Sequence, residues 1–337
     1  MTGRRDVVAV GASAGGVEAL RALVAGLPPD LPAAILVVLH IPRDAPSALP
    51  AILDRSGPLP ARHAVDGEPV RPGRIYVAPN DRHLLLLDGQ LRLTRGPAEN
   101  GHRPAVDPLF RSVARAAGRR AVGVVLSGSR DDGAAGLGSI AAAGGVTVVQ
   151  EPSDALYPGM PSAALAAVAI DHSLPAAKLG GLLAGIATVD LPPPTEDKPE
   201  DELLTAEVAM SELAAVTTDD LPVPPSGYGC PSCGGALFEL DDAPVPRFRC
   251  RVGHAWSPDS LLHEQAAALE SALWVALRAL EEKSSLGRRM AERQPPHTAS
   301  STRFRDMADD AAAAGATIRR LIGRLGSAGS DPGTEIG

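Results

Sequence analysis

The sequence feature that most restricts the fold is a regular alternation of short apolar runs and helical patterns through residues 6–186. The candidate strands are Val7–Val10, Ala34–Leu39, Arg74–Ala78, Ala121–Leu126 and Val146–Gln150. Helical patterns lie at about Val17–Leu27, Pro46–Asp54, Asp107–Ala117, Gly133–Ala143 and Pro161–Val168. Such alternation requires right-handed crossovers between mostly parallel strands. The sequence therefore predicts an α/β fold with a doubly wound, mostly parallel sheet.

One segment interrupts this alternation. Residues 84–93 read LLLLDGQLRL, so that an Asp-Gly pair joins two apolar runs. Asp-Gly favours the backbone of a tight β-hairpin turn, and one antiparallel hairpin is therefore expected. Aromatic residues make up only 3% of the chain, and its core must come from Ala, Leu, Val and Gly, as in buried parallel strands covered by helices.

The chain of 337 residues is longer than the roughly 250–300 residues at which one core stops growing. Composition changes after Val189, where proline-rich acidic stretches are typical of solvated linkers. We predict the following segments: an α/β domain over 1–189, a Pro/acidic linker over 190–227, a zinc-ribbon-like module over 228–258, a helical hairpin over 259–326 and a disordered tail over 327–337.

Apolar residues in the last segment recur at steps of four and three, from Leu262 to Leu280 and from Phe304 to Leu325. This spacing forms the apolar seam of a coiled coil, and the break at 294–297 separates two helices. An antiparallel helical hairpin is the simplest interpretation. Pairing of these helices with a second copy, giving a homodimer, stays open as an alternative.

The first strand runs into GASAGG at residues 11–16, just before a helical pattern. In the small-x-Ser-x-Gly turn, glycines permit a sharp strand-to-helix connection that exposes the serine. Glycine-rich turns also hold pyrophosphate, but an acidic residue then ends the second strand, and here that strand ends in His40. Ser13 is therefore a candidate nucleophile, with nucleotide binding or a turn without chemistry as alternatives.

Polar residues follow three strands whose carboxyl ends meet at one edge of the predicted sheet. Ser13 follows the first, His40 follows the second, and the pair Asp131-Asp132 follows the strand at 121–126. Ligands of doubly wound sheets bind at this edge. A serine becomes an effective nucleophile when an imidazole takes its proton, and a carboxylate orients that imidazole. These positions predict a serine hydrolase site.

Six ordered segments carry a family resemblance: GASAGG, LHIP, RPGRIYVAPNDRHL, VDPLFRSVA, LSGSRDDGAAGL and YPGMP. Together they resemble the catalytic domain of protein-glutamate methylesterases of the CheB type, over about residues 6–187. The resemblance implies hydrolysis of γ-glutamyl methyl esters on chemoreceptor-like signalling proteins, and deamidation of glutamines there. A non-catalytic signalling scaffold that retains the fold is the alternative.

The resemblance also implies roles for individual residues. Ser13 is the expected nucleophile and His40 the base, while Asp132 orients the base because the family has a non-acidic residue where Asp131 stands. The Ser129 amide is expected in the oxyanion hole, and Met160 is expected to line the cleft. Arg130 stands where the family has a glycine. A receiver domain is not expected, because the similarity starts near residue 6.

All three cysteines of the chain lie within residues 230–250. Cys230 and Cys233 form one close pair, and Cys250 and His254 form another after 16 intervening residues. Three thiolates and an imidazole make a closed tetrahedral set, so a structural zinc is predicted and no cofactor for catalysis. Redox chemistry of the CxxC pair, which leaves Cys250 unexplained, and incidental free thiols are the alternatives.

Charge and hydropathy restrict the partners. The formal charge of −8 makes nucleic acid an unlikely ligand, because phosphate binding depends on Lys and Arg. No apolar run approaches the ~20 residues that span a bilayer, and a cytoplasmic location is expected. The expected partner is a methylated chemoreceptor-like protein.

Overall fold

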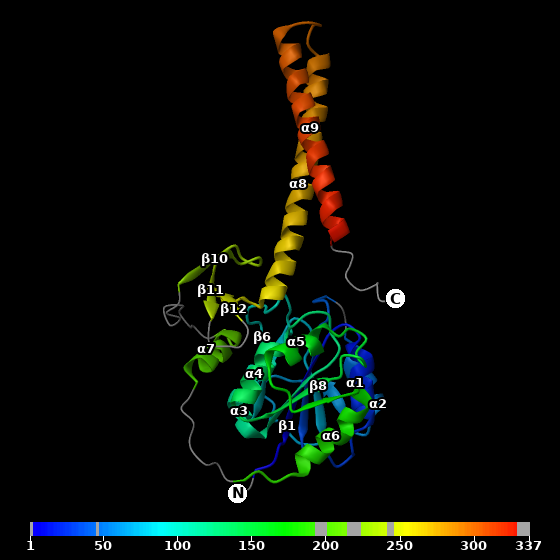
Figure 1. Cartoon of the computed structure of the whole chain (residues 1–337), viewed down its shortest axis with the longest axis vertical. Helices are drawn as coiled ribbons and strands as arrows, with labels where there is room; N and C mark the ends of the chain where they lie inside the picture. Colours follow the sequence, from blue (N-terminus) through cyan, green and yellow to red (C-terminus); the bar gives the residue numbers. More distant parts are fainter. Residues whose placement is uncertain (1–2, 45–46, 193–200, 214–223, 241–245, 329–337) are drawn as a thin grey trace. The chain divides into compact units, whose positions relative to one another are not determined.

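The computed structural model describes residues 3–44, 47–192, 201–213, 224–240 and 246–328 (Figure 1). Contacts divide the chain into two compact units, 1–261 and 262–337, which we describe separately. Most of the tail predicted over 327–337 lies outside the described residues. No described helix is both long enough and apolar enough to cross a membrane.

A seven-stranded sheet of order β3-β4-β2-β1-β7-β8-β9 forms the centre of the first unit, and all its strand pairs are parallel. Its strands are β1 (Val7–Ala12), β2 (Ala34–Leu39), β3 (Ala61–His63), β4 (Arg74–Val77), β7 (Ala121–Val125), β8 (Val146–Gln150) and β9 (His172–Leu174). The chain proceeds from β1 to one side and later returns to β7 on the other. The strand order thus reverses between β1 and β7, where ligands of such sheets bind.

Helices cover both faces of this sheet, which confirms the predicted doubly wound α/β fold (Figure 1). One face carries α1 (Gly16–Ala25), α2 (Leu49–Ser56) and α6 (Ala176–Thr188), and the other carries α3 (Val106–Ala117), α4 (Ala134–Ala142) and α5 (Gly159–Ala167). Successive residues of a strand point to opposite faces. Val8 and Val10 accordingly pack in one apolar layer, while Val7 and Ala9 pack in the other.

The predicted hairpin is present as β5 (His83–Leu87) and β6 (Gln90–Thr94). Its turn residues Asp88 and Gly89 have φ angles of 49° and 74°. Two consecutive left-handed residues match the twist of an antiparallel pair, which is why Asp-Gly is a reliable turn sequence. A short 3-10 helix, Gly118–Arg120, precedes β7.

The rest of the first unit is a helix and a small sheet. Helix α7 (Glu202–Ser211) lies inside the segment expected to be linker, and its Glu207 and Val208 are buried. Asp201 caps it, because its carboxylate accepts the Leu204 amide at 2.9 Å. The antiparallel sheet has the order β10 (Pro225–Gly229), β11 (Ala236–Leu240), β12 (Arg247–Cys250) and β13 (Ala255–Trp256).

The second unit contains α9 (Ala299–Ala328) and most of α8 (Pro258–Glu292), which run antiparallel as a helical hairpin (Figure 1). Leu277 and Ala291 of α8 are buried, as are Ala308 and Ala311 of α9. The sequence seam was expected to start at Leu262, but Leu262 and Leu269 are exposed. The buried seam of the hairpin is therefore shorter than the apolar repeat.

Candidate active site

Ser13 lies in a tight turn between β1 and α1. Gly15 in this turn has a φ of 69°, and a Cβ there would lie 2.7 Å from Ser127 Oγ. Only glycine fits such a position without strain. The Ser13 amide donates to the Ser127 carbonyl at 2.9 Å, which joins this turn to the loop after β7.

Backbone pairing of β1 with β2 places Ser13 beside His40. Ala12 of β1 pairs with Leu39 of β2, and the His40 amide donates to the Ala12 carbonyl at 3.0 Å. Within the described residues, no hydrogen bond is recorded for the Ser13 hydroxyl. The structure therefore brings the two backbones together without a formed Ser–His hydrogen bond, and such bonds often tighten only when substrate binds.

His40 and Asp132 form a direct pair, with His40 Nε2 2.7 Å from Asp132 Oδ2. Their side chains are only 6% and 3% exposed. Since Nε2 faces the carboxylate, Nδ1 is the ring nitrogen left for another partner. The structure thus places a carboxylate-oriented imidazole next to the serine turn.

Asp132 is held from several directions at the start of α3. It accepts the amides of Val106 at 2.6 Å and Asp107 at 3.2 Å, and the side-chain amide of Asn100 at 3.0 Å. Burial alone would raise the pKa of Asp132, but the hydrogen bond and charge of His40 and the Val106 amide lower it well below its ordinary value. Asp132 is therefore a carboxylate at neutral pH.

A second carboxyl, that of Asp107, lies beside this pair. Burial and the neighbouring Asp132 raise the pKa of Asp107 well above its ordinary value. Asp107 Oδ1 accepts the amides of Gly133 and Gly136 at 3.0 and 2.7 Å, which ties α3 to the start of α4. Its role is to fix the loop that carries Asp132.

Sequence reasoning missed His102, whose ring stacks on that of His40. The ring centroids lie 3.8 Å apart with an interplanar angle of 11°. Burial, together with the positive charge that His40 can carry, lowers the pKa of His102 to about 3. His102 is thus a neutral ring that fixes the plane of His40, and a lone histidine in a loop gave no sequence signal for this contact.

The loop after β7, which carries Gly128 and Ser129, packs between the serine turn and Met160 of α5. A Cβ on Gly128 would lie 2.0 Å from Met160 Sδ and 3.0 Å from Ser13 Cβ. Gly128 therefore lies between these two side chains, where no larger residue fits. The amides of Gly128 and Met160 are occupied, donating to the Tyr157 and Gly128 carbonyls. Over the described residues, the Ser129 amide has no recorded acceptor, and Ser129 is exposed.

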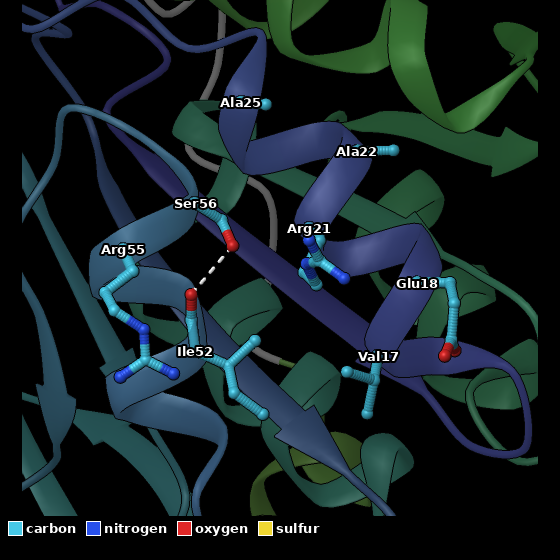
Figure 2. Close-up of a pocket in the computed structure, with 8 residues that line it drawn as sticks. All are labelled: Val17, Glu18, Arg21, Ala22, Ala25, Ile52, Arg55 and Ser56. Atoms are coloured by element: carbon cyan, nitrogen blue, oxygen red, sulfur yellow. Dashed lines mark hydrogen bonds between the residues drawn. The ribbon is translucent and has the colours of Figure 1, made fainter.

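A groove of about 790 Å³ lies between α1 and α2 (Figure 2). Its lining residues are Val17, Glu18, Arg21, Ala22, Ala25, Ile52, Arg55 and Ser56. None of the residues predicted to act in catalysis lines this groove. Its walls also lack a convergent set of nucleophile, base and acid, so we place the chemistry at Ser13, His40 and Asp132.

The three cysteines and His254 form a separate cluster, with all four donor atoms within 4.8 Å of one another. Cys233 Sγ lies 3.7 Å from Cys250 Sγ, and Cys250 Sγ lies 3.5 Å from His254 Nδ1. Thiolates bound to tetrahedral zinc at about 2.3 Å lie about 3.8 Å apart, so the donor set fits this metal. The Trp256 indole donates to Cys230 Sγ at 3.4 Å, as an outer partner of a metal ligand would.

Known proteins resemble the α/β part of this chain. "Protein-glutamate methylesterase/protein-glutamine glutaminase 2" of Anaeromyxobacter dehalogenans is 45% identical over 172 residues, which cover 51% of this chain and 50% of that protein. The protein-glutamate methylesterase/protein-glutamine glutaminase of Yersinia pestis is 46% identical over 164 residues, 48% of this chain and 47% of its own. The chain thus spans about half the length of the curated relatives it matches.

A solved structure agrees with these relatives. The crystal structure of the Thermotoga maritima CheB methylesterase catalytic domain has a TM-score of 0.52 and 32% identity, and the match covers 53% of this chain and 97% of that one. Residues 8–183, just over half of the 337-residue chain, match the CheB methylesterase family. The chain belongs to the CheB methylesterase family.

Proposed function

We propose that this chain is a serine hydrolase that removes the methyl group from γ-glutamyl methyl esters of chemoreceptor-like signalling proteins. The observation that carries the proposal is the buried His40–Asp132 pair beside the serine turn, at the carboxyl edge of the sheet. The names of the matched relatives support methyl esters of protein glutamate as the substrate. Their second named activity, on protein glutamine, supports deamidation by the same residues.

The proposed reaction proceeds through an acyl-enzyme. Ser13 Oγ attacks the ester carbonyl while His40 accepts the hydroxyl proton, through Nδ1 because Nε2 is bonded to Asp132. The C–O bond to the methoxy group breaks, and His40 returns the proton to the leaving methanol. Water then attacks the acyl carbonyl while His40 accepts its proton. The bond between that carbon and Ser13 Oγ breaks, His40 returns the proton to Ser13 Oγ, and the glutamate carboxylate is released. For glutamine, ammonia leaves in place of methanol.

The Ser129 amide is proposed to donate to the oxyanion that forms during both steps. Its lack of a recorded acceptor among the described residues and its exposed position support this assignment. One such donor contributes about 3–4 kcal/mol to the transition state. Met160, which is 1% exposed, would keep the Gly128 backbone in place under Ser13.

The test of this function is methanol release from a methylated receptor fragment by Ser13→Ala and by the matched control Ser173→Ala. Ser173 is exposed on β9 at the far edge of the sheet. We expect Ser13→Ala to lose at least about 10³-fold in kcat, with loss of labelling by a fluorophosphonate probe, because the nucleophile is gone. Ser173→Ala should retain both. Undiminished methanol release by Ser13→Ala would refute the proposal.

We further propose that Cys230, Cys233, Cys250 and His254 hold one structural zinc ion. Their four donors would close the coordination shell, and the metal would supply folding free energy to a sheet with few apolar residues. Elemental analysis of the purified chain should give one zinc per chain, and Cys233→Ser should abolish it. Full occupancy in Cys233→Ser would contradict the ligand set.

Location and self-association are also proposals. Cysteines that form no disulfide and are proposed to bind metal suit a reducing compartment, which supports action in the cytoplasm. In the second unit, Leu262 and Leu269 of the apolar repeat are 67% and 51% exposed, and their i,i+7 spacing puts them on one face of α8. Covering this face with a second copy favours association, so we propose a homodimer through these helices. Light scattering should give twice the chain mass for the parent and a monomer for Leu262→Lys combined with Leu269→Lys.

A further inference from the structure

The segment that follows the Cys/His cluster contacts the loop that holds Asp132, and both belong to the first compact unit. The Asn100 amide donates to the Ala255 carbonyl at 2.8 Å. The Ser257 amide donates to Asn100 Oδ1 at 2.9 Å. Ala255 directly follows His254, a candidate metal ligand. Asn100 is therefore hydrogen-bonded to the residue next to the cluster.

These contacts fix which way the Asn100 side chain faces. Since a backbone N–H can only donate, the end of Asn100 that meets Ser257 must be its oxygen. The NH₂ end must then face the opposite way, where it donates to Asp132 Oδ1 at 3.0 Å and to Asp107 Oδ2 at 3.2 Å. Asn100 is 3% exposed and has a φ of 52°, a conformation that Asn tolerates better than most residues.

A buried charge network holds the two regions together beside Asn100. Arg249 is 1% exposed, and it donates to Glu99 at 3.1 Å, to Glu207 at 2.9 Å and to the Gly253 carbonyl at 2.8 Å. Arg111 of α3 pairs with the same Glu99. Separating these groups would leave buried charges without partners, which is strongly unfavourable. The network thus holds the small sheet against α3 and the segment that carries Asn100.

The same segment also contacts the residue next to the Asp132 carboxylate. Asp131 Oδ1 accepts the hydroxyls of Ser257 at 2.8 Å and of Ser260 at 3.0 Å. The cavity between the two regions has a volume of about 20 Å³, enough for about one water molecule. Two consecutive acidic residues of the catalytic loop are therefore positioned, directly or through Asn100, by the segment after the cluster.

We infer that the Cys/His module contributes to the hydrolytic site by orienting Asn100 through Ser257 and Ala255. Asn100 in turn holds the Asp132 carboxylate against His40. Loss of the metal therefore lowers the hydrolytic rate. This inference rests on the proposed hydrolase function. Asn100 acts as a positioning residue, since it contacts Asp132 and not the reacting atoms. Release of the metal would free residues 250–257 and leave the orientation of Asn100 undetermined.

The test is a double-mutant cycle in the full-length chain, with a zinc-loaded parent and the changes Asn100→Ala and Cys233→Ser, the second of which removes the metal. Cys233 is the exposed ligand, so its replacement disturbs packing least. The readouts are kcat/KM for methanol release and the low-field proton resonance of the N–H shared by His40 and Asp132, identified by its loss in His40→Ala. Each single change should lower kcat/KM by about tenfold to a hundredfold and broaden the resonance, because small displacements of catalytic groups have effects of this size. The kcat/KM of the double variant should be no lower than that of the more severely affected single variant.

A second pair of variants keeps the cluster intact. Ser257→Pro removes the N–H that orients Asn100. Ser257→Ala keeps that N–H and loses only the hydroxyl, which donates to Asp131 and accepts the Ser260 amide at the start of α8. We expect Ser257→Pro to resemble Asn100→Ala while retaining its zinc, and Ser257→Ala to show a smaller loss. Ser226→Ala, which loses a hydrogen bond to the Leu237 carbonyl within the small sheet, should match the parent chain.

The outcomes separate this inference from the proposed function. A parent chain that neither releases methanol nor reacts at Ser13 would overturn the hydrolase function itself. An active parent whose zinc-free Cys233→Ser form keeps its rate and its low-field resonance would overturn the inference alone. Independent, multiplicative losses in the cycle would overturn it as well, because they would show that the cluster does not act through Asn100.

Discussion

The α/β region and the Cys/His module reach a defined structure in different ways. The central sheet buries two extensive apolar layers, one on each face, and its site residues stand at the ends of strands within them. The apolar cluster of the module contains six residues: Cys230, Leu237, Phe248, Cys250, Trp256 and Leu261. Two of its six members are themselves metal-ligand candidates. The proposed site is thus built on a hydrophobic core, whereas the small sheet beside it is held by buried charge and, as proposed above, by a metal ion.

The largest effect that separates the two regions is expected for Asp132→Asn. The amide preserves the shape of the carboxylate but stabilises the wrong tautomer of His40, so kcat should fall by about 10⁴-fold. Zinc content should not change, because Asp132 contacts no ligand of the cluster. Methanol release and elemental analysis on the same sample measure both. A loss of zinc together with activity would show that the regions are not separable.

A smaller effect on stability is expected for Arg249→Met. Removing one member of a buried charge network leaves Glu99 and Glu207 without that partner and should lower the free energy of unfolding by about 3–5 kcal/mol. The matched control is Arg278→Met on α8, whose exposed i,i+4 pair with Glu282 contributes only about 0.3–0.5 kcal/mol. Urea unfolding measures both, and equal changes would contradict the buried network.

Removal of the metal should act on one region only. With a chelator, backbone amides of β11 and β12 should exchange with deuterium about a hundredfold faster, because their small core depends on the metal. Amides of β1 and β7 should keep their protection, since they lie in the central sheet. Hydrogen exchange followed by mass spectrometry resolves these segments. Uniform loss of protection would mean that the two regions unfold as one.

The smallest expected effect concerns the pH dependence of stability. His102 stays neutral in the folded chain down to about pH 3, whereas in the unfolded chain it binds a proton near its ordinary value of 6.5. Between these values the unfolded state holds more protons, so stability falls as the pH decreases, by at most about 1.4 kcal/mol per unit from this residue. His102→Gln should reduce the slope of urea midpoint against pH between 6 and 4. An unchanged slope would show that His102 is not buried as a neutral ring.

Local sequence patterns determined the α/β architecture and the candidate site. Alternating strand and helix periods specify crossovers, and Asp88-Gly89 specifies a hairpin turn, because each depends on residues close together in the chain. Ser13, His40 and Asp132 could be assigned to one edge because strand ends of a parallel sheet meet there. The four donors of the cluster were found by their spacing, which is also local.

Tertiary structure alone decided what surrounds that site. His102 stacks on His40, and Asn100 links Asp132 to Ser257, a residue 157 positions away. No period or spacing in a sequence encodes contacts at such separations, since they depend on how already formed elements pack. The shortened seam of α8 and the burial of Glu207 inside an acidic linker have the same cause. A side chain's partners are set by three-dimensional packing, while its secondary structure is largely set by its neighbours in sequence.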